Sequence, residues 1–443
     1  MARTLINNGT IISAEGRFEG YIIIEGDTIA EVAKGRYDSH FDGTIVDARG
    51  KYIMPGVIDT HVHFREPGLT EKADWTSESI AAVAGGVTTV FDMPNTKPVT
   101  VTLDDVERKA DIAAQKSYVN YSIFLGATND NLKDIKRLDP KTVCGVKLFM
   151  GSSTGGMLVN DNYTLSAVFA ESPVIISSHC ESELRVAANM AEFKQRYPDA
   201  TAIIHPQVRD TEACYSSSAL AVELADKYGS RLNVAHITTA QELTLFEDKP
   251  TSDKKITAEV TASHLWFCDE DYATLGNFIK CNPAVKTRAD RDALRAALGR
   301  RIDSIVTDHA PHTLTEKQRP YWEAPSGMPM VEFSLSTALE LCKMGVMSYE
   351  MVVRLMCNAP ADIYNISHRG YLKSGYKADI VIIEPDVKRT IATSDIHSKC
   401  GWSPISGTTF SHRIAATYVN GRQVWNGKEI CSDICSERVI FDR

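Results

Sequence analysis

Residues 53–63 read IMPGVIDTHVH, a short apolar run that ends in two histidines separated by one residue. A continuous apolar run of this length is typical of a strand that is buried on both faces. Alternate side chains of a strand point to the same side, so the imidazoles of His61 and His63 can reach one metal ion. A lone His-x-His pair is a weak indication of a metal site, and its weight depends on the rest of the chain.

Similar apolar runs recur through the middle of the chain, where they alternate with segments of helical periodicity. The predicted strands are Ile53–Asp59, Val87–Met93, Tyr118–Leu125, Val143–Phe149, Val174–Ser178, Leu232–Ala235, Lys255–Val260 and Ser304–Thr307. One connector, Thr102–Lys116, is predicted to be a helix capped by Thr102 or Asp104. Its buried face is predicted to contain Val106, Ala110 and Ala113. Eight strands with helical crossovers indicate an α/β fold, a (β/α)8 barrel of the TIM type.

The two ends of the chain have a different character from the middle. Short β-rich runs are separated there by turn signals at Asn8-Gly9, Gly26-Asp27, Gly35 and Asn420-Gly421. Because chain ends often lie close together in a compact domain, both ends are predicted to build one small β-sandwich. The sandwich would comprise residues 1–52 and 366–443, and the catalytic barrel residues 53–365.

The composition is that of an ordinary globular protein, because 43% of the 443 residues are hydrophobic and 24% are charged. The formal net charge of -9 argues against a nucleic-acid-binding protein. No stretch approaches the roughly 20 apolar residues that span a membrane, and no signal peptide is recognisable. Ten cysteines without a repeating spacing favour free thiols in a reducing cytoplasm. Cys431 and Cys435 lie four apart without a second ligand pair, so we expect incidental thiols there.

Polar side chains of the metal-ligand and substrate-binding types lie in or just after the predicted strands. They are His61, His63, Asn95, Lys147, His179, His236, His264, Asp308 and His312. The carboxyl ends of barrel strands meet at one mouth, so these residues are expected to converge there. Imidazoles and carboxylates are good ligands for Zn and similar ions. The positional agreement predicts a metal site more strongly than the His-x-His pair does.

Lys147 lies inside a predicted strand, where an ammonium group costs several kcal/mol to bury. It is either a lysine that snorkels or forms an ion pair, or a lysine that nearby cations deprotonate. A neutral amine can react with carbon dioxide to give a carbamate, whose two oxygens can bridge two metal ions.

Asp308 lies in VTDHAPH, just after the last predicted strand. One interpretation is a helix-capping aspartate. The other is a carboxylate that contacts a metal ion, accepts a proton from the attacking water and delivers it to the departing nitrogen.

Five segments in this order resemble the amidohydrolase superfamily and, within it, the longer barrel-plus-sandwich class of dihydroorotase. They are DTHVHFREPG (59–68), FDMPNTKPV (91–99), EVTASHL (259–265), KCNPAVKTR (280–288) and VTDHAPHT (306–313). The resemblance implies a distorted β/α barrel with a sandwich from both termini. It also implies a metal-dependent cyclic amidohydrolase that interconverts L-dihydroorotate and N-carbamoyl-L-aspartate, a step of pyrimidine biosynthesis, by way of a metal-bridging hydroxide.

The resemblance also implies roles for individual residues. Two divalent ions, with Zn expected first, would be held by His61, His63, Asp308, His179, His236 and a carboxylated Lys147. Substrate contacts would come from Arg65, Asn95, Asn282, His312, Ser326 and Gly327. Arg65 suits a substrate carboxylate because its guanidinium presents a planar fork of donors; the alternative is a surface salt bridge.

The sequence departs from this pattern in places. The substrate loop reads APSG, with Ser326 where the family often has phenylalanine. His205 and His264 are extra imidazoles, which we expect to be structural because six ligands already complete the site. A homodimer is plausible for this family.

Two rival functions remain open. A dihydropyrimidinase or allantoinase would use the same metal ions on a ring without a carboxylate, and Arg65 argues against it. A catalytically silent scaffold would not need all six ligands.

Overall fold

The computed structural model describes residues 2–151 and 156–443. Its middle part is built on two parallel sheets. One sheet contains β6 (Val57–Val62), β7 (Val87–Asp92) and β8 (Asn120–Ile123). The other contains β9 (Leu125–Gly126), β10 (Val146–Phe149), β11 (Ile176–His179), β12 (Leu232–Val234), β13 (Ile256–Thr261) and β14 (Ser304–Val306).

The two sheets join into one barrel. Only Phe124 separates β8 from β9, so together they form the third barrel strand. At the other seam, Val62 of β6 pairs in parallel with His309, just beyond β14. The eight-stranded barrel predicted from the sequence is therefore confirmed.

The first predicted strand, Ile53–Asp59, is wrong as a single strand. Its first half belongs to β5 (Tyr52–Pro55), which pairs with β15 (Ile380–Thr390) outside the barrel. Gly56 separates β5 from β6, and a Cβ on Gly56 would lie 2.2 Å from Thr88 Oγ1, so no larger residue fits there. The proposed boundary between residues 52 and 53 falls inside β5, and the domain limits stay a prediction.

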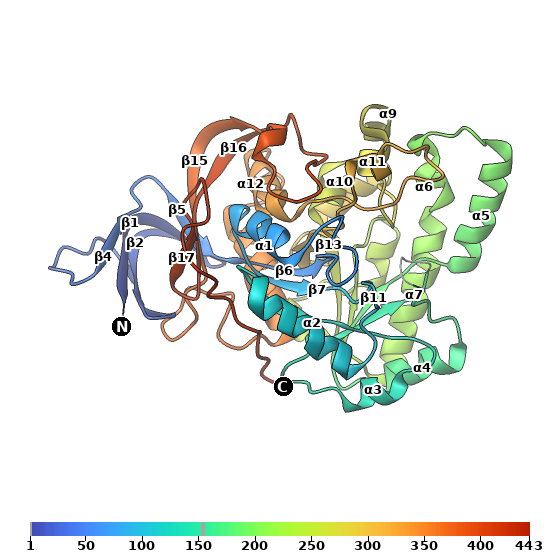
Figure 1. Cartoon of the computed structure of the whole chain (residues 1–443), viewed down its shortest axis with the longest axis horizontal. Coiled ribbons are helices and arrows are strands. Elements are labelled where there is room, and N and C mark those ends of the chain that lie inside the picture. Colours follow the sequence, from blue (N-terminus) through green and yellow to red (C-terminus); the bar gives the residue numbers. More distant parts are fainter. Residues whose placement is uncertain (1, 152–155) are drawn as a thin grey trace.

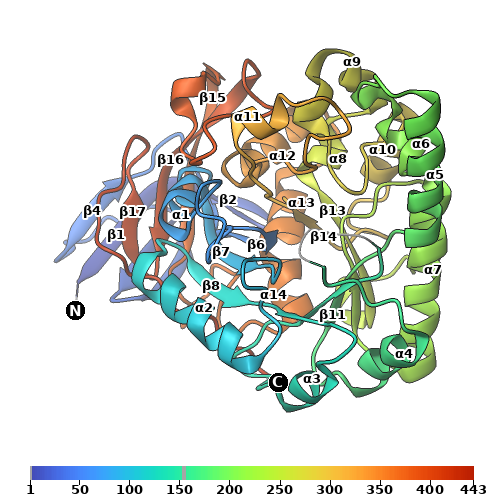
Figure 2. The ribbon, with the colours of Figure 1, turned by 45° about the vertical axis from the view of Figure 1, so that its right-hand side comes forward.

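Helices surround the barrel strands (Figures 1 and 2). They are α1 (Trp75–Ala84), α2 (Leu103–Lys116), α3 (Leu132–Arg137), α4 (Asn162–Glu171), α5 (Glu183–Arg196), α6 (His205–Val208), α7 (Thr211–Tyr228), α8 (Ala262–Trp266), α9 (Tyr272–Leu275), α10 (Arg288–Ala296), α11 (Leu314–Lys317), α12 (Ser334–Lys343), α13 (Tyr349–Val353) and α14 (Ala359–Tyr364). Helix α2 begins after Thr102, whose side chain accepts from Asp105 N and caps the helix, so the alternative cap Asp104 is wrong. Val106, Ala110 and Ala113 are buried, as predicted.

Strands from both ends of the chain form one curled sheet beside the barrel. They are β1 (Arg3–Ser13), β2 (Gly16–Glu25), β3 (Thr28–Lys34), β4 (Thr44–Asp47), β5, β15, β16 (Thr409–Val419) and β17 (Arg422–Trp425). Figure 1 shows the blue N-terminal strands beside the red C-terminal strands. Ile6, Ile22 and Ile380 belong to one buried cluster, so both ends share a core. This confirms the predicted sandwich of terminal strands.

The two Asn-Gly signals have different structures. Asn420 and Gly421 both have positive φ angles and connect β16 to β17, as a hairpin turn requires. Asn8-Gly9 lies inside β1, where the register with β2 shifts between Ile6 and Gly9. The turn predicted at Asn8-Gly9 is therefore wrong, because the same dipeptide also suits a β-bulge in a continuous strand.

All ten cysteines are free thiols, including Cys431 and Cys435. Within residues 2–151 and 156–443, none of the helices has the length and apolar character needed to cross a bilayer.

Candidate active site

A cavity of about 300 Å³ lies at the carboxyl ends of the barrel strands. Its lining contains all six predicted metal ligands and five of the six predicted substrate contacts. The lining residues are His61, His63, Arg65, Asn95, Lys147, Phe149, His179, Arg209, His236, Asn282, Asp308, Ala310, Pro325, Ser326 and Gly327. The sixth predicted contact, His312, lies behind this lining, against Arg65 and Ser326.

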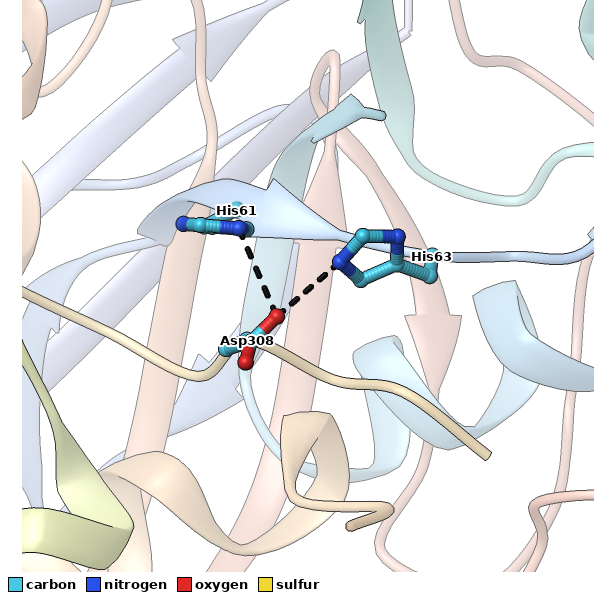
Figure 3. Close-up of side chains that lie close together, drawn as sticks. All are labelled: His61, His63 and Asp308. Carbon is cyan, nitrogen blue, oxygen red and sulfur yellow. Dashed lines mark hydrogen bonds and ion pairs between the residues drawn. The ribbon is translucent and has the colours of Figure 1, made fainter. Parts of the chain in front are cut away.

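The first half of the cavity floor is a cluster of His61, His63 and Asp308, whose ligand atoms all lie within 4.8 Å of one another (Figure 3). Asp308 Oδ1 lies 2.9 Å from His63 Nε2 and 3.4 Å from His61 Nε2. Burial opposes the ionisation of Asp308, but both imidazoles lower its pKa below the usual range. Helix α11 is capped by Thr313, so the interpretation of Asp308 as a helix cap is wrong.

Buried partners orient these two imidazoles. His61 Nδ1 lies 2.5 Å from Glu259 Oε1, and His63 Nδ1 lies 2.7 Å from Asn95 Oδ1. A contact at Nδ1 leaves Nε2 of each ring directed at Asp308, which is the arrangement of metal-binding histidines held from behind. This role of Glu259 was not predicted from the sequence, although Glu259 begins the EVTASHL segment (259–265).

The second half of the floor consists of His179 and His236. His179 Nδ1 lies 3.1 Å from His236 Nε2, and His179 Nε2 lies 3.0 Å from Glu181 Oε2. Glu181 in turn forms a buried ion pair with Arg209. The sequence analysis missed both residues. Glu181 follows His179 by two positions, and a carboxylate so close to a predicted ligand could have been noticed. Nothing in the sequence around Arg209 indicates its role.

Lys147 is fully buried beside both histidine pairs, and its Nζ lies 3.4 Å from His61 Nε2. A side chain without exposed surface does not snorkel. Burial lowers the pKa of Lys147 to about 8, so part of the amine is neutral at neutral pH. Neutral amine is the form that reacts with carbon dioxide.

The donor set fits divalent metal ions. Burial lowers the pKa of His61 and His236 well below the usual value, and both rings are neutral, as metal ligation requires. His179 Nδ1 and His236 Nε2 hydrogen-bond to each other at 3.1 Å, and either ring can be the donor. A cation bound by both nitrogens would replace this hydrogen bond, just as one beside Asp308 would be bound by His61 and His63.

The comparisons with known proteins agree with this geometry. A family model described as the amidohydrolase family matches residues 52–424. The chain belongs to the amidohydrolase family. It is therefore a hydrolase, of a family in which metal dependence is typical.

Curated relatives of this amidohydrolase include two archaeal proteins. The dihydroorotase of Halobacterium salinarum is 35% identical over 95% of this chain and 96% of its own length. That of Methanothermobacter thermautotrophicus is 32% identical over 92% and 91%. Among solved structures, the L-hydantoinase (dihydropyrimidinase) of Arthrobacter aurescens superimposes with a TM-score of 0.92, at 25% identity, over 99% of this chain and 100% of its own.

Three residues of the amidohydrolase cavity have positive φ angles, namely Arg65 (66°), His236 (37°) and Asp308 (49°). Such conformations cost about 1–3 kcal/mol for residues other than glycine, and they cluster at functional sites. The turn at Asp308 is held by its neighbour His309, which the sequence analysis also missed. His309 Nε2 lies 2.8 Å from Glu78 Oε2, and its Nδ1 accepts from Met330 N.

Arg65 and Asn282 also line the cavity. Arg65 is only 3% exposed, which excludes a surface salt bridge, and its Nε donates to Pro311 O at 3.0 Å. Asn282 Oδ1 is buried without a hydrogen-bond partner among the described residues. A buried polar atom of this kind indicates a ligand that supplies the missing donor.

Two buried lysines fix the wall that carries Ser326 and Gly327. Lys317 Nζ donates to the carbonyls of Lys280, Pro325 and Gly327, at 3.2, 3.0 and 2.9 Å. Lys280 Nζ donates to the carbonyls of Tyr321 and Ala324. Gly327 has a φ of 143°, and a Cβ there would lie 2.5 Å from Ala310 O, so this position requires glycine. Neither lysine was singled out in the sequence.

His205 and His264 are structural. His205 uses Nδ1 on the hydroxyl of Tyr321 and Nε2 on the carbonyl of Cys281. His264 uses Nδ1 on Thr261 and Nε2 on the carbonyl of Pro283. Neither residue lines the cavity that contains the six proposed ligands, so neither is assigned to a metal ion.

Proposed function

We propose that the protein catalyses the reversible hydrolysis of the cyclic amide of L-dihydroorotate to N-carbamoyl-L-aspartate. The observation that carries the proposal is the buried guanidinium of Arg65, which lines the same cavity as six side chains of metal-ligand type. Among residues 2–151 and 156–443 no carboxylate forms an ion pair with this guanidinium, and a ring that bears a carboxylate would supply the anion. The archaeal relatives that match nearly the whole chain carry the name dihydroorotase.

The proposal assigns His61, His63 and Asp308 to one Zn ion, and His179 and His236 to a second, with Lys147 between them. When bound, the ions would lower the pKa of a water molecule and polarise the amide carbonyl. Glu259 and Asn95 hold the first pair of imidazoles, and Glu181 holds His179, so the ligands are oriented before metal binds.

Lys147 is proposed to carry a carbamate. Its neutral amine adds to the carbon of CO2, a new N–C bond forms, and the proton leaves to solvent. Metal-loaded protein prepared in 13C-bicarbonate should show a carbamate carbon in its NMR spectrum. The signal should be missing from Lys147→Met, and the same spectrum for both proteins would contradict the modification.

Asp308 is the proposed general acid/base. Its carboxylate is ionised and lines the cavity, so it can accept a proton from the attacking water and return it to the departing ring nitrogen. In the synthetic direction the same carboxylate takes the proton from the ureido nitrogen as the ring closes. Ring closure would be one step of pyrimidine synthesis.

Arg65 is proposed to bind the substrate carboxylate, with Asn95 beside it. Asn282, whose Oδ1 has no partner among the described residues, would accept a hydrogen bond from a ring N–H. The backbone of Ser326 and Gly327 would close the cavity over the ring.

The alternative is a dihydropyrimidinase, and the close superposition on the Arthrobacter aurescens enzyme favours it. The two functions separate in one assay of the metal-loaded protein with dihydroorotate, dihydrouracil and allantoin. We expect dihydroorotate to have the largest kcat/KM. Turnover of dihydrouracil or allantoin without dihydroorotate would refute the proposal.

A homodimer and a cytoplasmic location remain predictions. Light scattering of the purified protein tests the first, and fractionation of the source cells tests the second.

A further inference from the structure

Lys72 contacts the active site through one hydrogen bond. Its Nζ lies 3.1 Å from Nδ1 of His312, and 2.8 Å from Oε1 of Glu316. An ammonium group only donates hydrogen bonds, so Nδ1 of His312 must accept. The imidazole proton of His312 is therefore on Nε2.

The other side of the imidazole leads independently to the same tautomer. His312 Nε2 lies 3.0 Å from the carbonyl oxygen of Ser326. A carbonyl only accepts, so Nε2 must carry the proton. Burial lowers the pKa of His312 to about 3; the Glu316 carboxylate opposes this shift, and Arg65 and Lys72 add to it, so the ring is neutral and has a single N–H. Oε2 of Glu316 lies 3.8 Å from Nδ1, beyond hydrogen-bond distance, so Lys72 is the nearer partner of Nδ1.

This tautomer decides the state of Arg65. Arg65 Nη2 lies 3.2 Å from the same Nε2 of His312. If the proton were on Nδ1, the lone pair of Nε2 would accept from Arg65 Nη2, and the protein would satisfy this donor internally. With the proton on Nε2, two donors face each other, and Arg65 Nη2 needs an acceptor from elsewhere.

We infer that Lys72 is a positioning residue that determines specificity: by donating to His312 Nδ1, it keeps the lone pair of His312 away from Arg65 and leaves that guanidinium for an anionic group of the ligand. The class of ligand is a cyclic amide that bears a carboxylate. The identity of the anion rests on the proposed function, whereas the position of the proton does not.

The first test measures the tautomer directly. Metal-loaded protein with 15N-labelled histidine, without substrate, is studied by long-range 1H–15N NMR, and the His312→Asn variant identifies the signals of His312. We expect Nε2 in the protonated range and Nδ1 in the unprotonated range. In Lys72→Met only the Ser326 carbonyl still favours this tautomer, so the Nε2 signal should move partly toward the unprotonated range. Identical 15N shifts of His312 in both proteins would overturn the role of Lys72. A proton on Nδ1 in the unaltered protein would overturn the inference.

The second test measures how the tautomer of His312 affects the affinity for a carboxylate-bearing ring. Orotate and uracil are planar rings that differ by the carboxylate, and their Kd values on the metal-loaded protein are measured by calorimetry. We expect Lys72→Met to weaken orotate about tenfold and to leave uracil unchanged, since a lost interaction with a charged group is of that size. Unchanged orotate affinity would overturn the inference.

Two control variants separate this role from a structural one. Lys72→Arg keeps a donor and should retain the orotate affinity. Glu316→Gln removes the charge that pairs with Lys72 but keeps the oxygen that caps α11, and it should also bind orotate normally. If Glu316→Gln weakens orotate as much as Lys72→Met does, Lys72 acts by supporting α11, and the inference is wrong.

The kinetic signature follows from the same argument. Lys72→Met should raise KM for dihydroorotate about tenfold with kcat changed less than about twofold, because uniform binding is lost. If dihydroorotate is not a substrate at all, the proposed function fails, while the NMR spectrum still decides the tautomer of His312.

Discussion

Different groups support the metal-ligand histidines and the wall of Ser326 and Gly327. On the histidine side, buried carboxylates stand behind imidazoles, as in His61–Glu259 and His179–Glu181. Along the wall of Ser326 and Gly327, lysine amino groups donate to backbone carbonyls or to an imidazole, as in the buried Lys317 and the half-buried Lys72.

The difference shows what each side is prepared to bind. Carboxylates behind imidazoles raise the basicity of the ligands and the negative potential around them, which favours cations. Around Arg65 the guanidinium itself and the nearby ammonium of Lys72 favour a substrate anion. One cavity thus presents a cation site and an anion site to the same small ring.

The largest expected effect comes from the histidine side. Asp308→Asn removes the group proposed to move the proton, so kcat for dihydroorotate should fall about 100- to 10,000-fold. Steady-state kinetics on metal-loaded protein measure the loss. The exposed carboxylate Asp386, which pairs with Lys343, provides the control, and Asp386→Asn should keep full activity. An Asp308→Asn variant with most of its activity would remove Asp308 from the mechanism.

An intermediate effect is expected where a carboxylate supports a ligand. Glu181→Gln removes the charge that holds His179 and pairs with Arg209, so affinity for one of two ions should fall about 10- to 100-fold. Metal content per chain, after dialysis against graded chelator concentrations, measures the change. Glu171→Gln, at an exposed glutamate paired with Lys136, should keep both ions. Equal metal retention by the two variants would contradict a supporting role for Glu181.

A smaller effect is expected from the wall. Lys317→Met removes a donor from three carbonyls, of which that of Lys280 still accepts from Gly327 N, and should lower the free energy of unfolding by about 1–3 kcal/mol. It should also raise KM, because Pro325 and Gly327 lose their anchor, while metal content stays unchanged. Denaturant unfolding and metal analysis test both statements, with exposed Lys343→Met as control. Loss of metal from Lys317→Met would mean that the two sides are not supported independently.

The sequence predicted the histidine side better than the wall, for a physical reason. Strand alternation places His61 and His63 on one side, and parallel strands bring their ends to one mouth, so spacing alone carries the information. The supports of the wall come from segments without such periodicity. Lys280 and Lys317 meet the carbonyls of residues 321–327 only because the connecting loops fold back on themselves.

Local sequence patterns also could not predict which charged side chains form buried ion pairs. Arg209 lies 28 positions after Glu181, and only packing brings the two side chains into an ion pair. The two Asn-Gly dipeptides make the same point. Both suit positive φ angles, but only the surrounding strands decide that Asn420-Gly421 ends a strand and Asn8-Gly9 bends one.

The sequence by itself determined the barrel, the sandwich of terminal strands and the set of residues at the strand ends. These follow from periodicities of two and 3.6 residues, which any chain segment expresses locally. The tertiary structure alone decided which charges stand behind those residues and which groups surround the two ring nitrogens of His312. Such choices depend on contacts between distant segments, because hydrogen bonds and desolvation act over distances in space and not along the chain.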